Sequence, residues 1–141
     1  MSKFKTQTPI IHIPSFTEYK ISASELSIEY KSLGITIPFP ISDNWYYFTD
    51  SDGWAKILPD IILKSDLYKA DKFDCEDYAM KAMLLCAERY GLNTLRYTYG
   101  DTPMGRHGFN TFWVGDIFQV FEPNTLGLSG IKDYKPISVL L

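Results

Sequence analysis

Several features that would assign this chain to a broad class are scarce or absent from its 141 residues. The formal net charge is only −3, which gives no electrostatic reason to expect a nucleic acid or an anionic membrane as partner. No apolar run approaches the roughly 18 residues of a membrane-spanning helix, and the first residues show no signal-peptide pattern. We therefore expect a cytoplasmic protein with no nucleic acid and no membrane among its partners.

Cysteine is also scarce, with only Cys75 and Cys86 in the chain. On one helix these two residues would lie about 16 Å apart, whereas the α-carbons of a disulfide are within about 7 Å of each other. The spacing therefore predicts two free thiols. Free thiols favour a reducing compartment, or a thiol that is kept free for use.

The length and composition are those of one globular domain spanning residues 1–141. Aromatic residues make up 16% of the chain, which favours a β-containing core or a groove lined with rings. The first 43 residues carry several prolines and show little readable pattern. A short helix over 24–34 is the main prediction there, with Ser24 as its cap and Gly34 as its end.

The middle of the chain predicts helices and the later part predicts strands. A strand is expected over 44–49, then a helix that Pro59 separates from a second short helix at 60–66. The clearest helix covers 75–90, with Asp74 as N-cap, Asp77 in a capping-box position and Gly91 as the end. Strands at 94–100, 107–114 and 117–122 follow, the last two joined by a two-residue turn at Gly115. This order predicts an α+β fold.

The start of the helix at Cys75 is the first candidate for chemistry. Unpaired backbone N–H groups and the helix dipole at this position stabilise a thiolate. In the two-residue hairpin, His107 shares one face with Glu122 and Asn124, and either side chain could orient its imidazole. A thiol, an imidazole and an acid or amide are the groups of a cysteine nucleophile with its base.

Three segments carry a resemblance to a known superfamily: FDCEDYA at 73–79, HGFN at 107–110 and FEPNT at 121–125. They resemble the transglutaminase-like and papain-like cysteine peptidases over about residues 45–126. The match is closest to their small bacterial and phage branch and to the protease domain of a fungal agglutinin. The resemblance implies a papain/transglutaminase-like core, in which N-terminal helices, with the nucleophile at a helix start, pack on an antiparallel sheet.

The resemblance also implies a function and a set of site residues. Cys75 would be the nucleophile, His107 the general base and Glu122 the orienting acid of a cysteine hydrolase that acts on peptide or amide bonds. An acyl-enzyme would form and be resolved by water or, in a transferase, by an amine. The remaining candidates are Tyr68 and Asn124 as oxyanion or orienting groups, and Asp74, Glu76 and Asp77 as calcium ligands. The chemistry itself requires no cofactor, and the substrate would be a peptide or protein.

A second function class stays open beside the enzyme. The chain would then be a non-catalytic binding or interaction module, associated with a phage or a cell wall, that retains the transglutaminase-like fold. Its ligand would lie in a groove lined by aromatic side chains such as Trp45, Tyr46 and Tyr47. The sequence does not decide the oligomeric state in either case.

Overall fold

The computed structural model describes residues 14–124, 127–130 and 133–141, and His12 lies outside them. The helical elements are α1 (Ala23–Ser32), α2 (Ser51–Ile61), the 3₁₀ turn η1 (Ser65–Leu67) and α3 (Cys75–Tyr90). The strands are β1 (Tyr19–Ser22), β2 (Trp45–Phe48), β3 (Arg96–Thr102), β4 (Gly105–Trp113), β5 (Phe118–Glu122), β6 (Gly127–Gly130) and β7 (Lys135–Val139). None of the helices in these ranges is long and apolar enough to cross a membrane.

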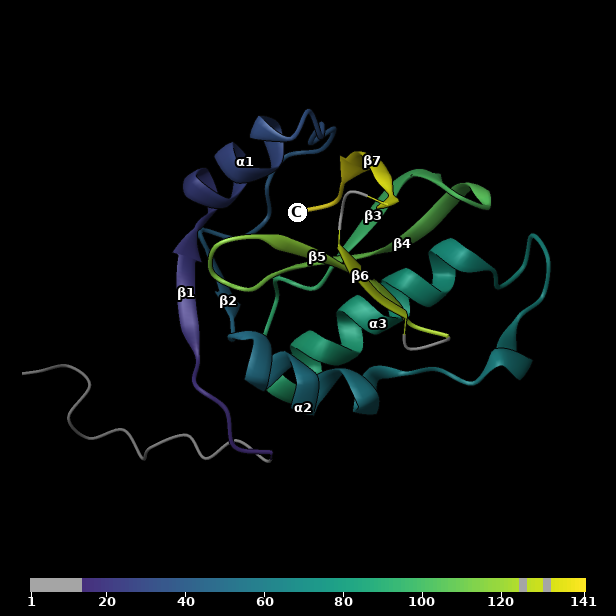
Figure 1. Cartoon of the computed structure of the whole chain (residues 1–141), viewed down its shortest axis with the longest axis horizontal. Helices are drawn as coiled ribbons and strands as arrows, with labels where there is room; N and C mark the ends of the chain where they lie inside the picture. Colours follow the sequence, from purple (N-terminus) through teal and green to yellow (C-terminus); the bar gives the residue numbers. More distant parts are fainter. Residues whose placement is uncertain (1–13, 125–126, 131–132) are drawn as a thin grey trace, which may run out of the picture.

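The centre of the fold is a five-stranded antiparallel sheet in the order β6-β5-β4-β3-β7 (Figure 1). Helix α1 covers one face, where Tyr30 stacks on Phe118 at 4.0 Å between ring centroids. Helices α2 and α3 cover the other face, where the Asn110 side chain donates to the Ala79 carbonyl at 2.9 Å. The strand expected over 44–49 is β2, and it pairs with β1, which was not predicted, to form a separate two-stranded sheet beside the N-terminal helices.

The core lies between the sheet and its helices. Aromatic side chains fill much of it, and those with less than 2% exposure are Tyr30, Tyr46, Trp54, Tyr78, Phe109, Phe112 and Phe121. The buried indole of Trp54 donates to the Trp113 carbonyl at 2.9 Å, so its polar atom is satisfied. The high aromatic content of the sequence therefore builds the interior of the protein as well as its grooves.

The prediction for α3 is confirmed at both ends. The helix runs from Cys75 to Tyr90, and the Asp74 backbone N–H donates to the Asp77 carboxylate at 3.2 Å. Gly91 ends the helix with φ of 67°, a left-handed conformation that glycine adopts without a steric penalty. Cys75 and Cys86 are free thiols, as the spacing predicted.

The predicted hairpin register is also confirmed. Trp113 pairs with Phe118 and Asn110 with Phe121, and the Val114 N–H donates to the Ile117 carbonyl at 3.1 Å. Gly115 has φ of 112°, which the two-residue turn requires. Because side chains alternate along a strand, this register places His107 and Glu122 on the same face of the β4–β5 hairpin.

Two boundary predictions are wrong for local reasons. Helix α1 begins two residues earlier than expected, because the hydroxyl of Ser22 rather than that of Ser24 caps it and accepts the Glu25 N–H at 3.1 Å. Pro59 does not divide two helices: α2 continues through it to Ile61, and only the 3₁₀ turn η1 follows. A proline in the last turn removes one hydrogen bond but leaves the preceding turns intact.

Candidate functional site

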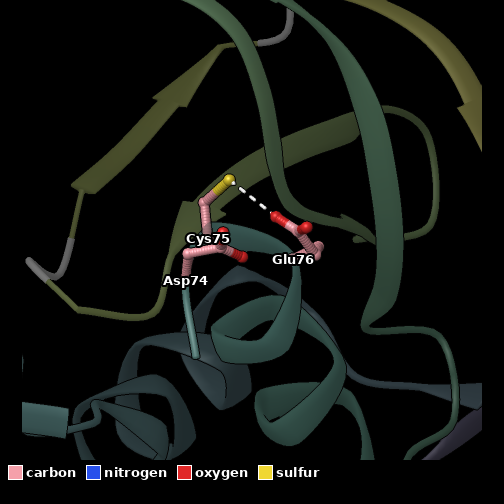
Figure 2. Close-up of side chains that lie close together, drawn as sticks. All are labelled: Asp74, Cys75 and Glu76. Atoms are coloured by element: carbon pink, nitrogen blue, oxygen red, sulfur yellow. Dashed lines mark hydrogen bonds between the residues drawn. The ribbon is translucent and has the colours of Figure 1, made fainter. Parts of the chain in front are cut away.

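The thiol of Cys75 lies at the first position of α3, where the helix meets β4. Its Sγ donates to the Glu76 carboxylate at 3.2 Å (Figure 2) and accepts from the Gly108 N–H at 3.4 Å. Burial raises the pKa of this thiol above its ordinary value, and the Glu76 and Asp74 carboxylates raise it further, against the opposing Gly108 N–H. This environment favours the protonated form of the thiol, whereas a helix start was expected to stabilise the thiolate.

The imidazole of His107 has a different partner. Its Nε2 lies 3.0 Å from both oxygens of the Glu122 carboxylate, and the Tyr134 hydroxyl donates to the same carboxylate at 2.8 Å. Among the described residues, no hydrogen bond joins His107 to Cys75. The structure therefore brings His107 and Glu122 together and adds Tyr134, which the sequence analysis missed, since its contact crosses the sheet from the segment before β7.

The two remaining candidates for orienting or oxyanion roles take no part in this arrangement. Tyr68 ends η1 with 54% of its surface exposed, and its only hydrogen bond within the described ranges is made by its backbone N–H. Asn124 is half-buried after β5, and no side-chain hydrogen bond links it to His107 in the described part of the chain. The longer Glu122 side chain reaches the imidazole from the diagonal position instead.

Asp74 and Glu76 flank the thiol, and the Glu76 carboxylate is the hydrogen-bond acceptor of the Cys75 Sγ (Figure 2). The neighbouring Glu76 carboxylate raises the pKa of Asp74, and the Asp74 carboxyl group lowers the pKa of Glu76. With Cys75 they place three potential ligand atoms within 4.8 Å of one another. Calcium takes about six to eight oxygen ligands, and Asp77 is engaged in the helix cap, so calcium binding by Asp74, Glu76 and Asp77 stays a prediction.

A groove lies beside this helix start, along β3 and β7. It encloses about 250 Å³ and is lined by Pro38, Phe39, Tyr97, Tyr99, Ser138, Val139 and Leu140. Phe39 is 63% exposed and Tyr99 is 37% exposed, so both rings present surface to a ligand. Arg106, paired with Asp101 at 2.6 Å, lies over the Tyr99 ring at 5.7 Å from its centroid.

The aromatic groove predicted from Trp45, Tyr46 and Tyr47 is not formed by those residues. Alternate residues of β2 point to opposite sides, so Tyr46 is fully buried in the core while Trp45 is 44% exposed. The Lys20 ammonium lies 4.3 Å from the centroid of the Trp45 ring and covers it. The aromatic groove is formed instead by Tyr97 and Tyr99 of β3 together with Phe39, where the sequence analysis predicted none.

No protein-family model matches the sequence, and no curated protein matches it. Solved structures do resemble it. One is the complex of PSL1a with E64, with a TM-score of 0.67, 20% identity, and coverage of 86% of this chain and 51% of that chain. Another is the Polyporus squamosus lectin bound to the human-type influenza-binding epitope Neu5Aca2-6Galb1-4GlcNAc, with a TM-score of 0.69, 20% identity, and coverage of 86% of this chain and 49% of that chain.

The chain thus spans about half the length of the lectin structures that it resembles, and the likeness at this identity concerns the fold. These neighbours correct the expected papain/transglutaminase-like core: the helices and sheets match part of a lectin instead. Membership of the transglutaminase-like and papain-like superfamily stays a prediction, since no family model matches.

The same neighbours correct the expected function. The expectation of a cysteine hydrolase or thiol protease with Cys75 as nucleophile and a peptide substrate is contradicted by these neighbours, one of which is named a lectin; at 20% identity the likeness extends to the fold alone. The contacts agree with this correction, because the Cys75 thiol donates to Glu76 and its pKa is raised. An activated thiolate would need the opposite environment, with a cation or imidazolium at hydrogen-bonding distance.

Proposed function

We propose that this domain is a non-catalytic binding module that holds a carbohydrate chain in the groove along β3 and β7. The observation that carries the proposal is the exposed pair of rings, Phe39 and Tyr99, on a hollow of about 250 Å³. An aromatic face carries partial negative charge, and the C–H bonds on one face of a pyranose ring carry partial positive charge. Flat sugar rings therefore stack on such side chains.

The groove also offers polar groups for sugar hydroxyls. Within the described residues, the hydroxyls of Tyr97 and Ser138 make no hydrogen bond, although both residues line the groove. A hydroxyl can donate one hydrogen bond and accept others, which suits a ligand whose rim consists of hydroxyls. Apolar lining with a few polar groups that fix orientation is the usual composition of a ligand site.

The likeness to lectin structures supports the ligand class. One of those structures is bound to a sialylated trisaccharide epitope, according to its name. That ligand belongs to a protein of which this chain matches 49%, so the groove geometry is needed to assign carbohydrate binding to this domain.

A glycan array probed with the wild-type protein tests the proposal, with Neu5Aca2-6Galb1-4GlcNAc included among its spots. The double variant Phe39→Ala/Tyr99→Ala should lose at least about tenfold in affinity for every glycan that binds, as expected when stacking anchors are removed. The matched control is Trp45→Ala, which removes an aromatic side chain with 44% exposure on β2, outside the groove. Absence of glycan binding, or equal binding by the double variant, would overturn the carbohydrate assignment.

The non-catalytic part of the proposal has its own test. We expect no cleavage of a peptide substrate library, and no mass increase after incubation with E64, the compound found with PSL1a. The control is Cys75→Ala, which removes the only thiol at the helix start. Cleavage that disappears in Cys75→Ala, or an E64 adduct that requires Cys75, would show that the thiol is reactive and would reject the binding-only function.

A further inference from the structure

Two adjoining hollows lie on the opposite side of the sheet from α3, between α1 and the β4–β5 turn. The larger hollow encloses about 340 Å³ and is lined by Lys20, Ile21, Glu25, Ile28, Glu29, Phe48, Trp113 and Gly115. The smaller encloses about 130 Å³ and is lined by Glu29, Ser32, Leu33, Trp113, Asp116, Ile117 and Phe118. Because Glu29 and Trp113 belong to both, the hollows form one continuous surface, here called the α1 surface.

Aliphatic side chains on the α1 surface are exposed to an unusual degree. Ile28 is 63% exposed, Leu33 51% and Ile117 53%, while Trp113 and Phe118 form a buried floor beneath them. A single exposed aliphatic residue is ordinary on a soluble protein, but several around one concave floor indicate a contact surface. The smaller hollow has room for one aliphatic side chain of a partner.

The rim of the α1 surface is acidic. The carboxylates of Glu25, Glu29 and Asp116 form no ion pair with any residue in the described ranges, and all three are exposed. Lys20 is the single basic residue that lines either hollow, and its ammonium lies over the Trp45 ring. The combination of apolar floor and unpaired carboxylates is complementary to a partner that carries an apolar anchor and positive charge.

We propose that the α1 surface docks a segment of a partner protein that inserts an aliphatic side chain over Trp113 and Phe118. Lysine or arginine residues of that segment lie within one helical turn of the anchor and face Glu29 and Asp116. An apolar anchor in a pocket surrounded by a charged rim is the usual form of a compact interface. The α1 surface shares no lining residue with the carbohydrate groove, so a partner on one does not occupy the other.

Selection of peptides from a random phage-displayed library against the whole protein tests this proposal. The enriched peptides should share an aliphatic residue with Lys or Arg within four positions. A synthetic peptide with that consensus should lose at least about tenfold in affinity for Ile117→Asp and about fivefold for Glu29→Lys, measured by fluorescence anisotropy. Added salt should weaken binding to the wild type, because the rim contacts are exposed.

Matched controls come from α3, where Leu84 is 64% exposed and Glu88 is also exposed, away from the α1 surface. Leu84→Asp and Glu88→Lys should bind the consensus peptide as tightly as the wild type. Failure to enrich any peptide, a consensus without basic residues, or equal affinity for Ile117→Asp would overturn the proposal. Circular dichroism of each variant verifies folding, and a change in peptide binding by Phe39→Ala/Tyr99→Ala would assign the peptides to the groove instead.

Discussion

The helix start at Cys75 and the aromatic groove adjoin at Tyr97, yet they differ in how far their side chains are already engaged inside the protein. Around the helix start, Cys75, Glu76, His107 and Glu122 all have hydrogen-bond partners inside the protein. In the groove, the rings of Phe39 and Tyr99 are exposed to solvent. Burial raises the pKa of Tyr97 to about 12, and the nearby Glu76 and Cys75 contribute to the increase.

This difference indicates which side chains contribute to folding stability and which are available to bind a ligand. Groups that are already paired with one another contribute to folding and have little capacity left for a ligand, whereas exposed rings contribute little to folding and can bind. The comparison predicts that substitutions near Cys75 change stability or thiol chemistry first. Substitutions in the groove should change ligand affinity first.

The largest effect is expected from Glu122→Ala. Glu122 is 8% exposed, and its carboxylate is the partner of both His107 and Tyr134. Its loss leaves two partly buried polar groups unpaired, which should lower the free energy of unfolding by about 2–3 kcal/mol. Urea denaturation followed by tryptophan fluorescence measures this change.

Glu122→Gln is the matched control, because the amide retains one acceptor and nearly the same volume. It should cost about 1 kcal/mol. If Glu122→Ala unfolded at the same urea concentration as the wild type, the hydrogen bonds around this carboxylate would contribute nothing to folding. The two regions would then not differ in their contribution to stability.

A smaller loss is expected for Gly108→Ala, at the boundary between the two regions. An added Cβ would lie 3.0 Å from the Glu76 Cα and 3.0 Å from the Tyr97 ring. The helix backbone or the ring must move, at a cost of about 1–2 kcal/mol in unfolding free energy.

The same substitution should weaken glycan binding, because Tyr97 also lines the groove. Thermal unfolding and a glycan titration on one preparation measure both changes. A variant with lowered stability and unchanged glycan affinity would show that the two regions are not coupled through Tyr97.

A kinetic effect of about two- to fivefold is expected for alkylation of Cys75 in Glu76→Gln. The carboxylate raises the pKa of the thiol, so its removal lowers that pKa and increases the thiolate fraction at pH 8. Iodoacetamide modification followed by peptide mass spectrometry gives the rate.

Cys86 is the internal reference for that experiment, since complete burial raises its pKa to about 12 and should leave it nearly unmodified in the folded protein. In the wild type, the alkylation rate of Cys75 should reach half its maximum at a higher pH than that of a cysteine in an unfolded peptide. A midpoint below that of the peptide would mean that the thiolate is stabilised after all.

The smallest effect on stability is expected for Tyr99→Ala, the groove residue with 37% exposure. It should change the unfolding free energy by less than about 1 kcal/mol, because little apolar surface is lost from the interior. A loss comparable to that of Glu122→Ala would place Tyr99 among the structural residues and would contradict its assignment to ligand binding.

Local patterns in the sequence were sufficient for the elements that depend on neighbouring residues. Asp74, Asp77 and Gly91 predicted α3 correctly because capping acts within one turn. Gly115 fixed the register of the β4–β5 hairpin because a two-residue turn leaves only one pairing. That register in turn placed His107 and Glu122 on one face.

Contacts between distant segments could not be predicted in the same way. Whether the Cys75 thiol would face His107 or Glu76 depends on how α3 approaches β4, and no local pattern specifies that approach. The same holds for Tyr134, which reaches Glu122 from the segment before β7. The groove was assigned to Trp45–Tyr47 because aromatic residues are frequent there, but alternation along β2 buries Tyr46.

The position of β7 has a consequence for how the protein is made. This last strand pairs with β3 rather than with β6, and it also bonds to the segment before β2 through the Thr36 N–H, which donates to the Ile137 carbonyl at 2.8 Å. During translation, the edge of β3 therefore stays unpaired until residue 139 has left the ribosome. An open strand edge of this kind can pair with other chains. The nascent chain should therefore depend most on chaperones between the synthesis of β3 and the synthesis of β7.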